Sequence, residues 1–231
     1  MIEFFIAVIC LLFFSFYRIF FATYIIFCDV KFFLYDWYIP MIYMAILSSL
    51  KRFDTYPNQR ILKRFLPFTV LLFIGMMFFV NYMFDISNYP VSFFQSQLCF
   101  SGPIIKSHFA QMTSSELQMY TYAQYVDYGY MIAYGLLIFC VGIFLGRLFP
   151  VTSFFHYASY IIGLAGILAA CCDAIEDVFI LLMVSNPIGF PDIYAVIHSC
   201  FASVKFAILG IFLIWVLLTV FVLIWFKVKK K

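Results

Sequence analysis

Hydrophobic residues in this chain fall into six long runs that are separated by short polar stretches. The runs extend over approximately residues 2–28, 32–50, 65–84, 121–149, 155–184 and 194–226. A helix of about 20 apolar residues crosses the roughly 30 Å hydrocarbon core of a bilayer. The pattern therefore predicts an all-α fold, a polytopic integral membrane bundle of six transmembrane helices. Residues 86–120 form the longest interval between runs and predict a long outer loop.

The fourth run is preceded by a helix-start signal. Thr113-Ser-Ser-Glu116 is a capping-box pattern, in which the first and last side chains bond reciprocally to the backbone. The predicted helix extends from this pattern to about Leu148 and is roughly 50 Å long at 1.5 Å per residue. Because this exceeds the bilayer core, its tyrosine-rich first turns are expected in the headgroup region.

Composition adds that almost no sequence remains for a soluble domain. Of 231 residues, 66% are hydrophobic and only 11% are charged, which predicts a single transmembrane domain over residues 1–231. The first run has no basic region before it and no small-residue cleavage site, so we expect a retained span and not a signal peptide. The seven cysteines lack metal or disulfide spacing.

The basic residues cluster at the ends of the predicted spans, which argues against a nucleic-acid partner despite the net charge of +3. Five Lys and Arg residues lie between the second and third runs and four follow the sixth, whereas residues 86–120 contain only Lys106. The positive-inside rule then predicts that both termini are cytoplasmic. The expected partners are membrane lipids, with a homo- or hetero-oligomer as a further possibility.

Three acids interrupt the fifth run, which is otherwise apolar. Asp173, Glu176 and Asp177 follow an i, i+3, i+4 pattern and share one face of a helix. Intramembrane carboxylates are expensive and commonly face a partner or a water-filled cavity. This segment is therefore the strongest candidate for a functional site.

The sixth run carries a candidate partner for these acids. Lys205 and Asp173 both lie roughly 16 Å from the turn that joins the last two spans, so the antiparallel hairpin predicts that they face each other. His198 lies on the same helix face as Lys205 and should be level with Glu176 and Asp177. A lysine paired with one acid can be purely structural.

The acids outnumber this lysine, however, and two more stand at helix starts in other spans. In low dielectric, surplus carboxylates should be protonated, hydrated or bound to a cation. Whether the site holds a metal, a proton or only Lys205 stays open, and no cofactor is defined. The candidate substrate- or ion-binding residues are Asp173, Glu176, Asp177, Lys205, His198, Asp127 and Asp36.

Small residues line the first half of the fifth run. Gly166-x3-Ala170 lies on the same face as the acids and would allow a neighbouring helix to come close. We expect tight packing at this level and a polar cavity on the other side of the acids, towards the outer leaflet. Ordinary helix packing without a cavity is the alternative.

One resemblance covers the chain from about the third run to the C-terminus. The elements are Asp127-Tyr128 with Tyr134, then Asp173-x2-Glu176-Asp177, then Gly189-Phe-Pro191, then Lys205. This order resembles a group of prokaryotic four-helix membrane proteins whose third helix carries an acid-x2-Glu-Asn/Asp signature. The resemblance implies that Asp173, Glu176 and Lys205 form one site, but it implies no activity.

The sequence supports three kinds of function. Proton- or cation-linked transport or permeation is the preferred interpretation, because uncompensated acid in a membrane commonly lies on an ion pathway. A membrane-embedded enzyme that acts on lipid is the first alternative, so whether the protein is an enzyme stays undecided. A structural subunit of a membrane assembly is the second, with 33 Phe and 17 Tyr available to cover partner helices.

Overall fold

The computed structural model describes residue 45 and residues 47–229, and all regular structure in this part of the chain is helical. The chain divides into two compact units, residues 1–54 and 55–231. The predicted all-α class is confirmed for the described residues. The predicted span at 2–28 and nearly all of the span at 32–50 lie outside them, so six spans and a single domain stay predictions.

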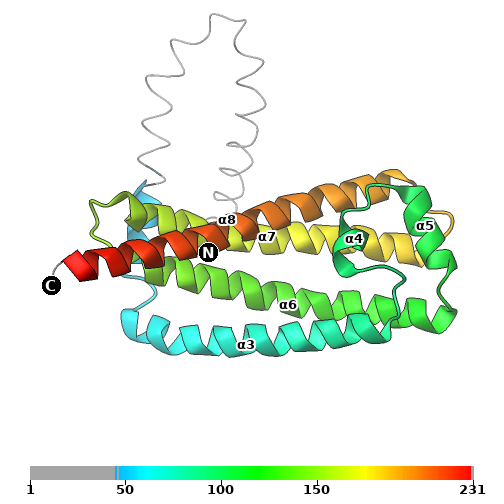
Figure 1. The fold of residues 1–231 in the computed structure, drawn as a ribbon, viewed down its shortest axis with the longest axis horizontal. Helices are drawn as coiled ribbons and strands as arrows, with labels where there is room; N and C mark the ends of the chain where they lie inside the picture. The colour runs from blue at the N-terminus through cyan, green and yellow to red at the C-terminus, as the bar shows by residue number, and fades with distance from the viewer. Residues whose placement is uncertain (1–44, 46, 230–231) are drawn as a thin grey trace, which may run out of the picture. The chain divides into compact units, whose positions relative to one another are not determined.

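Four long helices lie side by side in the second unit, and neighbouring helices are antiparallel (Figure 1). Along the row, α6 packs between α3 and α7, and α7 packs between α6 and α8. These helices are α3 (Gln59–Ile86), α6 (Ser114–Gly146), α7 (Phe154–Ser185) and α8 (Ile193–Lys229). The predicted spans 65–84, 155–184 and 194–226 fall within α3, α7 and α8, whereas α6 ends three residues before the predicted span 121–149 does.

Helices α3, α6 and α8 are long and apolar enough to cross a membrane. The most apolar window of α8 is only 6% buried against the rest of the protein, compared with 56% for α6. Large side chains of α8 such as Leu213, Ile214 and Phe221 are exposed. Such a continuous apolar surface is stable against lipid and not against water. These helices therefore indicate a membrane protein.

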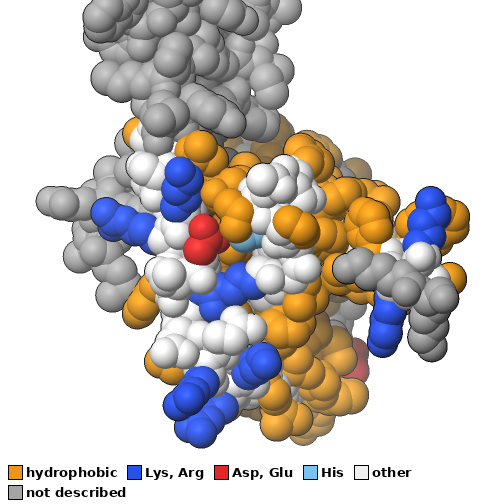
Figure 2. Space-filling model, turned by 90° about the vertical axis from the view of Figure 1, so that its left-hand side faces the viewer, with side chains coloured by type: hydrophobic (Ala, Val, Ile, Leu, Met, Phe, Trp, Pro, Cys, Tyr) orange, Lys and Arg blue, Asp and Glu red, His pale blue; other side chains and the backbone are white. Residues whose placement is uncertain are grey.

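Basic side chains gather at one end of the row of helices (Figure 2). Arg147 follows the end of α6 and binds the start of α3, with Nη1 donating to Gln59 Oε1 at 3.0 Å and Nη2 donating to Pro57 O at 2.7 Å. This end, called the basic end below, carries Arg60, Lys63, Arg64, Arg147, Lys227 and Lys229.

Two short helices cover the opposite end, called the cap end below (Figure 1). They are α4 (Phe93–Gln97) and α5 (Gly102–Ala110), within the interval predicted as a loop. Ser92 and Gln95 form a capping box that starts α4, and Pro103 stands in the first turn of α5, where its missing N–H costs nothing. The interval is therefore not a plain loop but a folded cap.

The predicted start of α6 is confirmed in detail. Thr113 N donates to Glu116 Oε2 at 2.8 Å, and Glu116 N donates to Thr113 Oγ1 at 3.3 Å. Both bonds of the capping box are therefore present, and α6 begins at Ser114.

The close approach predicted for the first half of α7 is also confirmed. A Cβ added to Gly142 of α6 would lie 2.5 Å from Gly163 Cα, and one added to Gly135 would lie 3.1 Å from Ala170 Cβ. One added to Gly166 would overlap Ile138. Helices α6 and α7 thus pack nearly backbone to backbone between the acids and the basic end.

An apolar core fills the cap end. It joins α5, the start of α6, the end of α7 and the start of α8, and it contains Ile105, Phe109, Met112, Tyr120, Ile180, Met183, Phe190 and Ala195. The polar residues of α7 therefore lie between this core and the glycine contacts.

Candidate functional site

A cluster of buried ionisable side chains lies where α6, α7 and α8 meet. Helix α6 contributes Asp127, α7 contributes Asp173, Glu176 and Asp177, and α8 contributes His198 and Lys205. Each of these residues is at most 3% exposed. Six of the seven candidate residues from the sequence therefore lie in one buried region, and Asp36 lies outside the described residues.

Lys205 is surrounded by three oxygens from two helices, α4 and α7. Its Nζ donates to Asp173 Oδ1 at 2.5 Å and to Gln97 Oε1 at 3.1 Å. It also forms an ion pair with Glu176 Oε2 at 2.6 Å. The predicted contact between Asp173 and Lys205 is confirmed, but the lysine holds two carboxylates and one amide. An ammonium group has three donors, so it has none left for a further acid.

Asp173 is held on its other side by Tyr134. The Tyr134 hydroxyl donates to Asp173 Oδ2 at 2.9 Å from α6. Both oxygens of Asp173 are therefore occupied, one by α8 and one by α6, and this carboxylate joins the three helices.

The structure adds Gln97 and Tyr134 to the residues that surround the site. Tyr134 lies seven residues after Asp127 on α6, so helical periodicity could have placed both on one face. Gln97 lies in α4, 108 residues before Lys205, and no local pattern indicates that it reaches the site.

His198 and Glu176 form a second pair with a defined tautomer. His198 Nε2 lies 3.3 Å from Ser96 O, and because a carbonyl only accepts, Nε2 carries the hydrogen. His198 Nδ1 lies 3.6 Å from Glu176 Oε1 and is not hydrogen-bonded. Two facing lone pairs repel each other in a dry interior, so we expect this pair to hold one proton.

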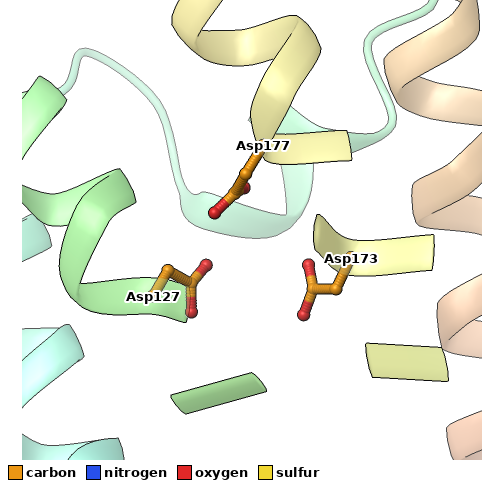
Figure 3. A group of neighbouring side chains, drawn as sticks. All are labelled: Asp127, Asp173 and Asp177. Carbon is orange, nitrogen blue, oxygen red and sulfur yellow. The ribbon is translucent and has the colours of Figure 1, made fainter. Parts of the chain in front are cut away.

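Neither oxygen of Asp177 has a hydrogen-bond partner among the described residues, and the same holds for Glu176. Glu176 forms an ion pair with Lys205, however, whereas Asp177 forms none among the described residues. Its side chain is fully buried. Figure 3 shows that its carboxylate and those of Asp127 and Asp173 face a common space between α6 and α7. One oxygen from each of the three lies within 4.8 Å of the others.

The charges of the cluster do not balance. Asp127, Asp173, Glu176 and Asp177 provide four carboxyl groups, whereas Lys205 is the one lysine or arginine among the described side chains of the cluster. Low dielectric makes a net charge of this size very unfavourable. Protons, water or a bound cation must therefore accompany these acids.

The cluster lies far from the basic end. Asp127 is 20 residues before Arg147 on α6, which corresponds to roughly 30 Å, and Lys205 is 22 residues before Lys227 on α8, which corresponds to roughly 33 Å. A hydrocarbon core is also about 30 Å thick. If the basic end stands in one headgroup layer, the cluster lies close to the opposite boundary of the core, beneath the cap.

No family model, no curated protein and no solved structure matches this chain.

Proposed function

We propose that the protein is a multi-span membrane protein that binds protons or cations at the cluster of Asp127, Asp173, Glu176 and Asp177 and supports their transport or permeation. The observation that carries the proposal is the fully buried Asp177, whose oxygens have no partner among the described residues. In our proposal the chain has six spans, and both termini are cytoplasmic.

A purely structural role would leave part of the cluster unexplained. Asp173, Glu176 and Gln97 already surround Lys205, so holding α7 to α8 does not require Asp127 or Asp177. Replacing buried charges by apolar side chains is often neutral or stabilising. Two further buried acids therefore do not help the helices to pack. Binding of a positively charged species would explain their presence.

The distribution of charge supports the orientation. Positive charge near the ends of α3, α6 and α8 collects at the basic end, which we place on the cytoplasmic side by the positive-inside rule. The cluster then lies near the outer boundary of the hydrocarbon core. A cation from outside would reach it by passing the cap or by passing between the helices beneath the cap.

The direct test is ion flux in vesicles reconstituted with the full chain. We expect Glu176→Gln and Asp177→Asn to lower a proton or cation flux that the wild-type protein produces. Asp192→Asn is the matched control, because it removes one carboxylate charge at a side chain that is 58% exposed and paired with Lys106. Equal proton and cation fluxes in wild type and both site variants would end the proposal.

A membrane enzyme that acts on lipid is the second candidate, and the level of the cluster favours it. A site at the boundary of the hydrocarbon core is where the headgroup and the first bonds of a lipid lie. Carboxylates beside His198 could exchange protons with such a substrate. If cells that lack the protein kept an unchanged lipid composition, this candidate would lose its support.

A further inference from the structure

We infer that Asp127, Asp173 and Asp177 bind one divalent cation of the hard, oxygen-preferring class, with Ca²⁺ as the best fit. The inference rests on the proposed function and specifies the ligand of the same cluster.

The spacing of the three carboxylates suits a shared ion. One oxygen from each acid lies within 4.8 Å of the others. Two oxygens bound to one ion can be separated by at most twice the bond length, which is about 5 Å for Ca²⁺ and about 4 Å for Mg²⁺. Ca²⁺ has longer bonds and a more flexible geometry than Mg²⁺, so smaller movements of the three side chains are needed for it to contact all of them.

The second observation is the unsatisfied state of Asp177. Its side chain is fully buried, both oxygens lack a hydrogen-bond partner among the described residues, and it points into the space that it shares with Asp127 (Figure 3). Lys205 cannot serve as its partner, since three other oxygens already surround Nζ. A bound cation would satisfy both Asp177 oxygens at once.

Asp173 can join such an ion without releasing its present partners. Its oxygens accept from Lys205 and Tyr134, but an ionised carboxylate has about four lone-pair sites. Asp173 would thus coordinate the ion while it still accepts the hydrogen bond from Lys205. Asp127 and Asp177 would be the principal ligands of the ion.

The charge of a divalent ion also fits the cluster. Together with Lys205, the four ionised acids have a net charge of minus three, and a divalent cation reduces this to minus one. A monovalent cation would reduce it only to minus two.

Gln124 provides a further candidate ligand. It lies one turn before Asp127 on the same face of α6, it is buried, and its Oε1 has no hydrogen-bond partner among the described residues. Amide oxygens are ordinary Ca²⁺ ligands. Water would complete the coordination.

The test measures metal binding to the detergent-purified full chain, with Ca²⁺, Mn²⁺ and Mg²⁺ as separate probes. Equilibrium binding of radioactive Ca²⁺ and thermal stability in Ca²⁺ and in chelator are the two readouts. We expect about one Ca²⁺ per wild-type chain and a higher melting temperature with Ca²⁺. Asp127→Asn and Asp177→Asn should each weaken binding at least about tenfold, whereas Asp192→Asn should bind as wild type does.

Two results would overturn the inference. One is the absence of saturable binding of all three metals to wild type at about 1 mM, the weak end of protein Ca²⁺ affinities. The other is equal binding by wild type and the folded site variants, which would locate the ion on exposed acids or detergent. Folding is checked by a single symmetric size-exclusion peak, and if one of the two site variants fails this check, the other carries the test.

The outcome is separable from that of the proposed function. Saturable Ca²⁺ binding that depends on Asp177, without any ion flux, would uphold the site and reject transport. A flux that depends on Asp177, with no divalent metal bound, would uphold transport by protons or monovalent ions and reject the divalent site.

Discussion

Asp173 and Asp177 lie one turn apart on the same face of α7, yet their carboxylates have opposite surroundings. Asp173 accepts hydrogen bonds from Lys205 at 2.5 Å and from Tyr134 at 2.9 Å. Asp177 has no hydrogen-bond partner among the described residues. The two acids should therefore respond in opposite ways to the same substitution.

We predict that Asp173→Asn destabilises the protein and that Asp177→Asn does not. The first change removes one of the two carboxylates that hold the buried Lys205, and loss of such a charged hydrogen bond typically costs about 1–3 kcal/mol. The second change removes a buried charge that has no partner among the described residues. Thermal unfolding in detergent and chelator, with Asp192→Asn as the control, measures the difference. Equal losses of melting temperature in the two site variants would contradict the assignment.

The pairing of Lys205 with Asp173 can be measured by a double-mutant cycle. Lys205→Met alone leaves the acids of the cluster without their lysine, and Asp173→Asn alone removes one acceptor of Lys205. We expect the double variant to lose less free energy of unfolding than the sum of the two single losses. The difference, which is the interaction energy, should be about 1–3 kcal/mol. Additive losses would show that the two side chains are not coupled.

The contact between α6 and α7 predicts a contrast between two glycines. A Cβ on Gly142 would meet Gly163 Cα at 2.5 Å and Ser159 O at 2.7 Å, which are backbone atoms that cannot turn aside. Gly142→Ala should therefore cost about 1–3 kcal/mol. Gly210 of α8 has nothing within 4 Å of its added Cβ, so Gly210→Ala should be neutral or stabilise by up to about 1 kcal/mol. The melting temperatures of the two variants would be compared, and similar shifts would refute close packing at Gly142.

The contact between Tyr89 and His108 leads us to predict that the cap is less stable at acidic pH. Tyr89 Oη lies 3.3 Å from His108 Nδ1, and burial raises the pKa of the Tyr89 hydroxyl to about 12, so the hydroxyl remains a donor to the neutral ring. Desolvation lowers the pKa of His108, so the unfolded chain binds this proton more readily than the folded chain. The contribution of neutral His108 is therefore present above the unfolded pKa of about 6.5 and is lost as the pH falls below it.

The measurement for this contact is the difference in melting temperature between wild type and His108→Asn from pH 8 to pH 5. Comparing the two proteins removes any dependence on pH that they share. The melting temperature of wild type should exceed that of His108→Asn by less as the pH falls below about 6.5. A difference that does not vary with pH would show that His108 does not contribute through its neutral form.

The parts of the site that depend on helical periodicity along one or two helices could be predicted from the sequence. The face shared by Asp173, Glu176 and Asp177 follows from 3.6 residues per turn, and the contact of Asp173 with Lys205 follows from equal distances to the turn between α7 and α8. The capping box at Thr113 is likewise a local signal.

The remaining contacts depend on how separate helices rotate against each other, which no local pattern specifies. Asp127 faces α7 because the glycine contacts fix the orientation of α6, and Gln97 reaches Lys205 because the cap folds back over α8. The sequence placed residues 86–120 in a loop, although Ser92 with Gln95 and Pro103 carry the same kind of start signal as Thr113.

The roughly 30 Å between the basic end and the acid cluster leaves nearly all of the hydrocarbon core on one side of the site. Because the membrane voltage falls across that core, a cation that reaches the cluster from the cap end crosses little of the electric field. Onward movement to the basic end is worth about 2.3 kcal/mol per charge for each 100 mV, and twice as much for a divalent ion. Binding at the cluster should therefore be nearly independent of voltage, whereas passage beyond it should depend on voltage steeply. With the basic end in the cytoplasm, a potential that is negative inside draws the ion inward.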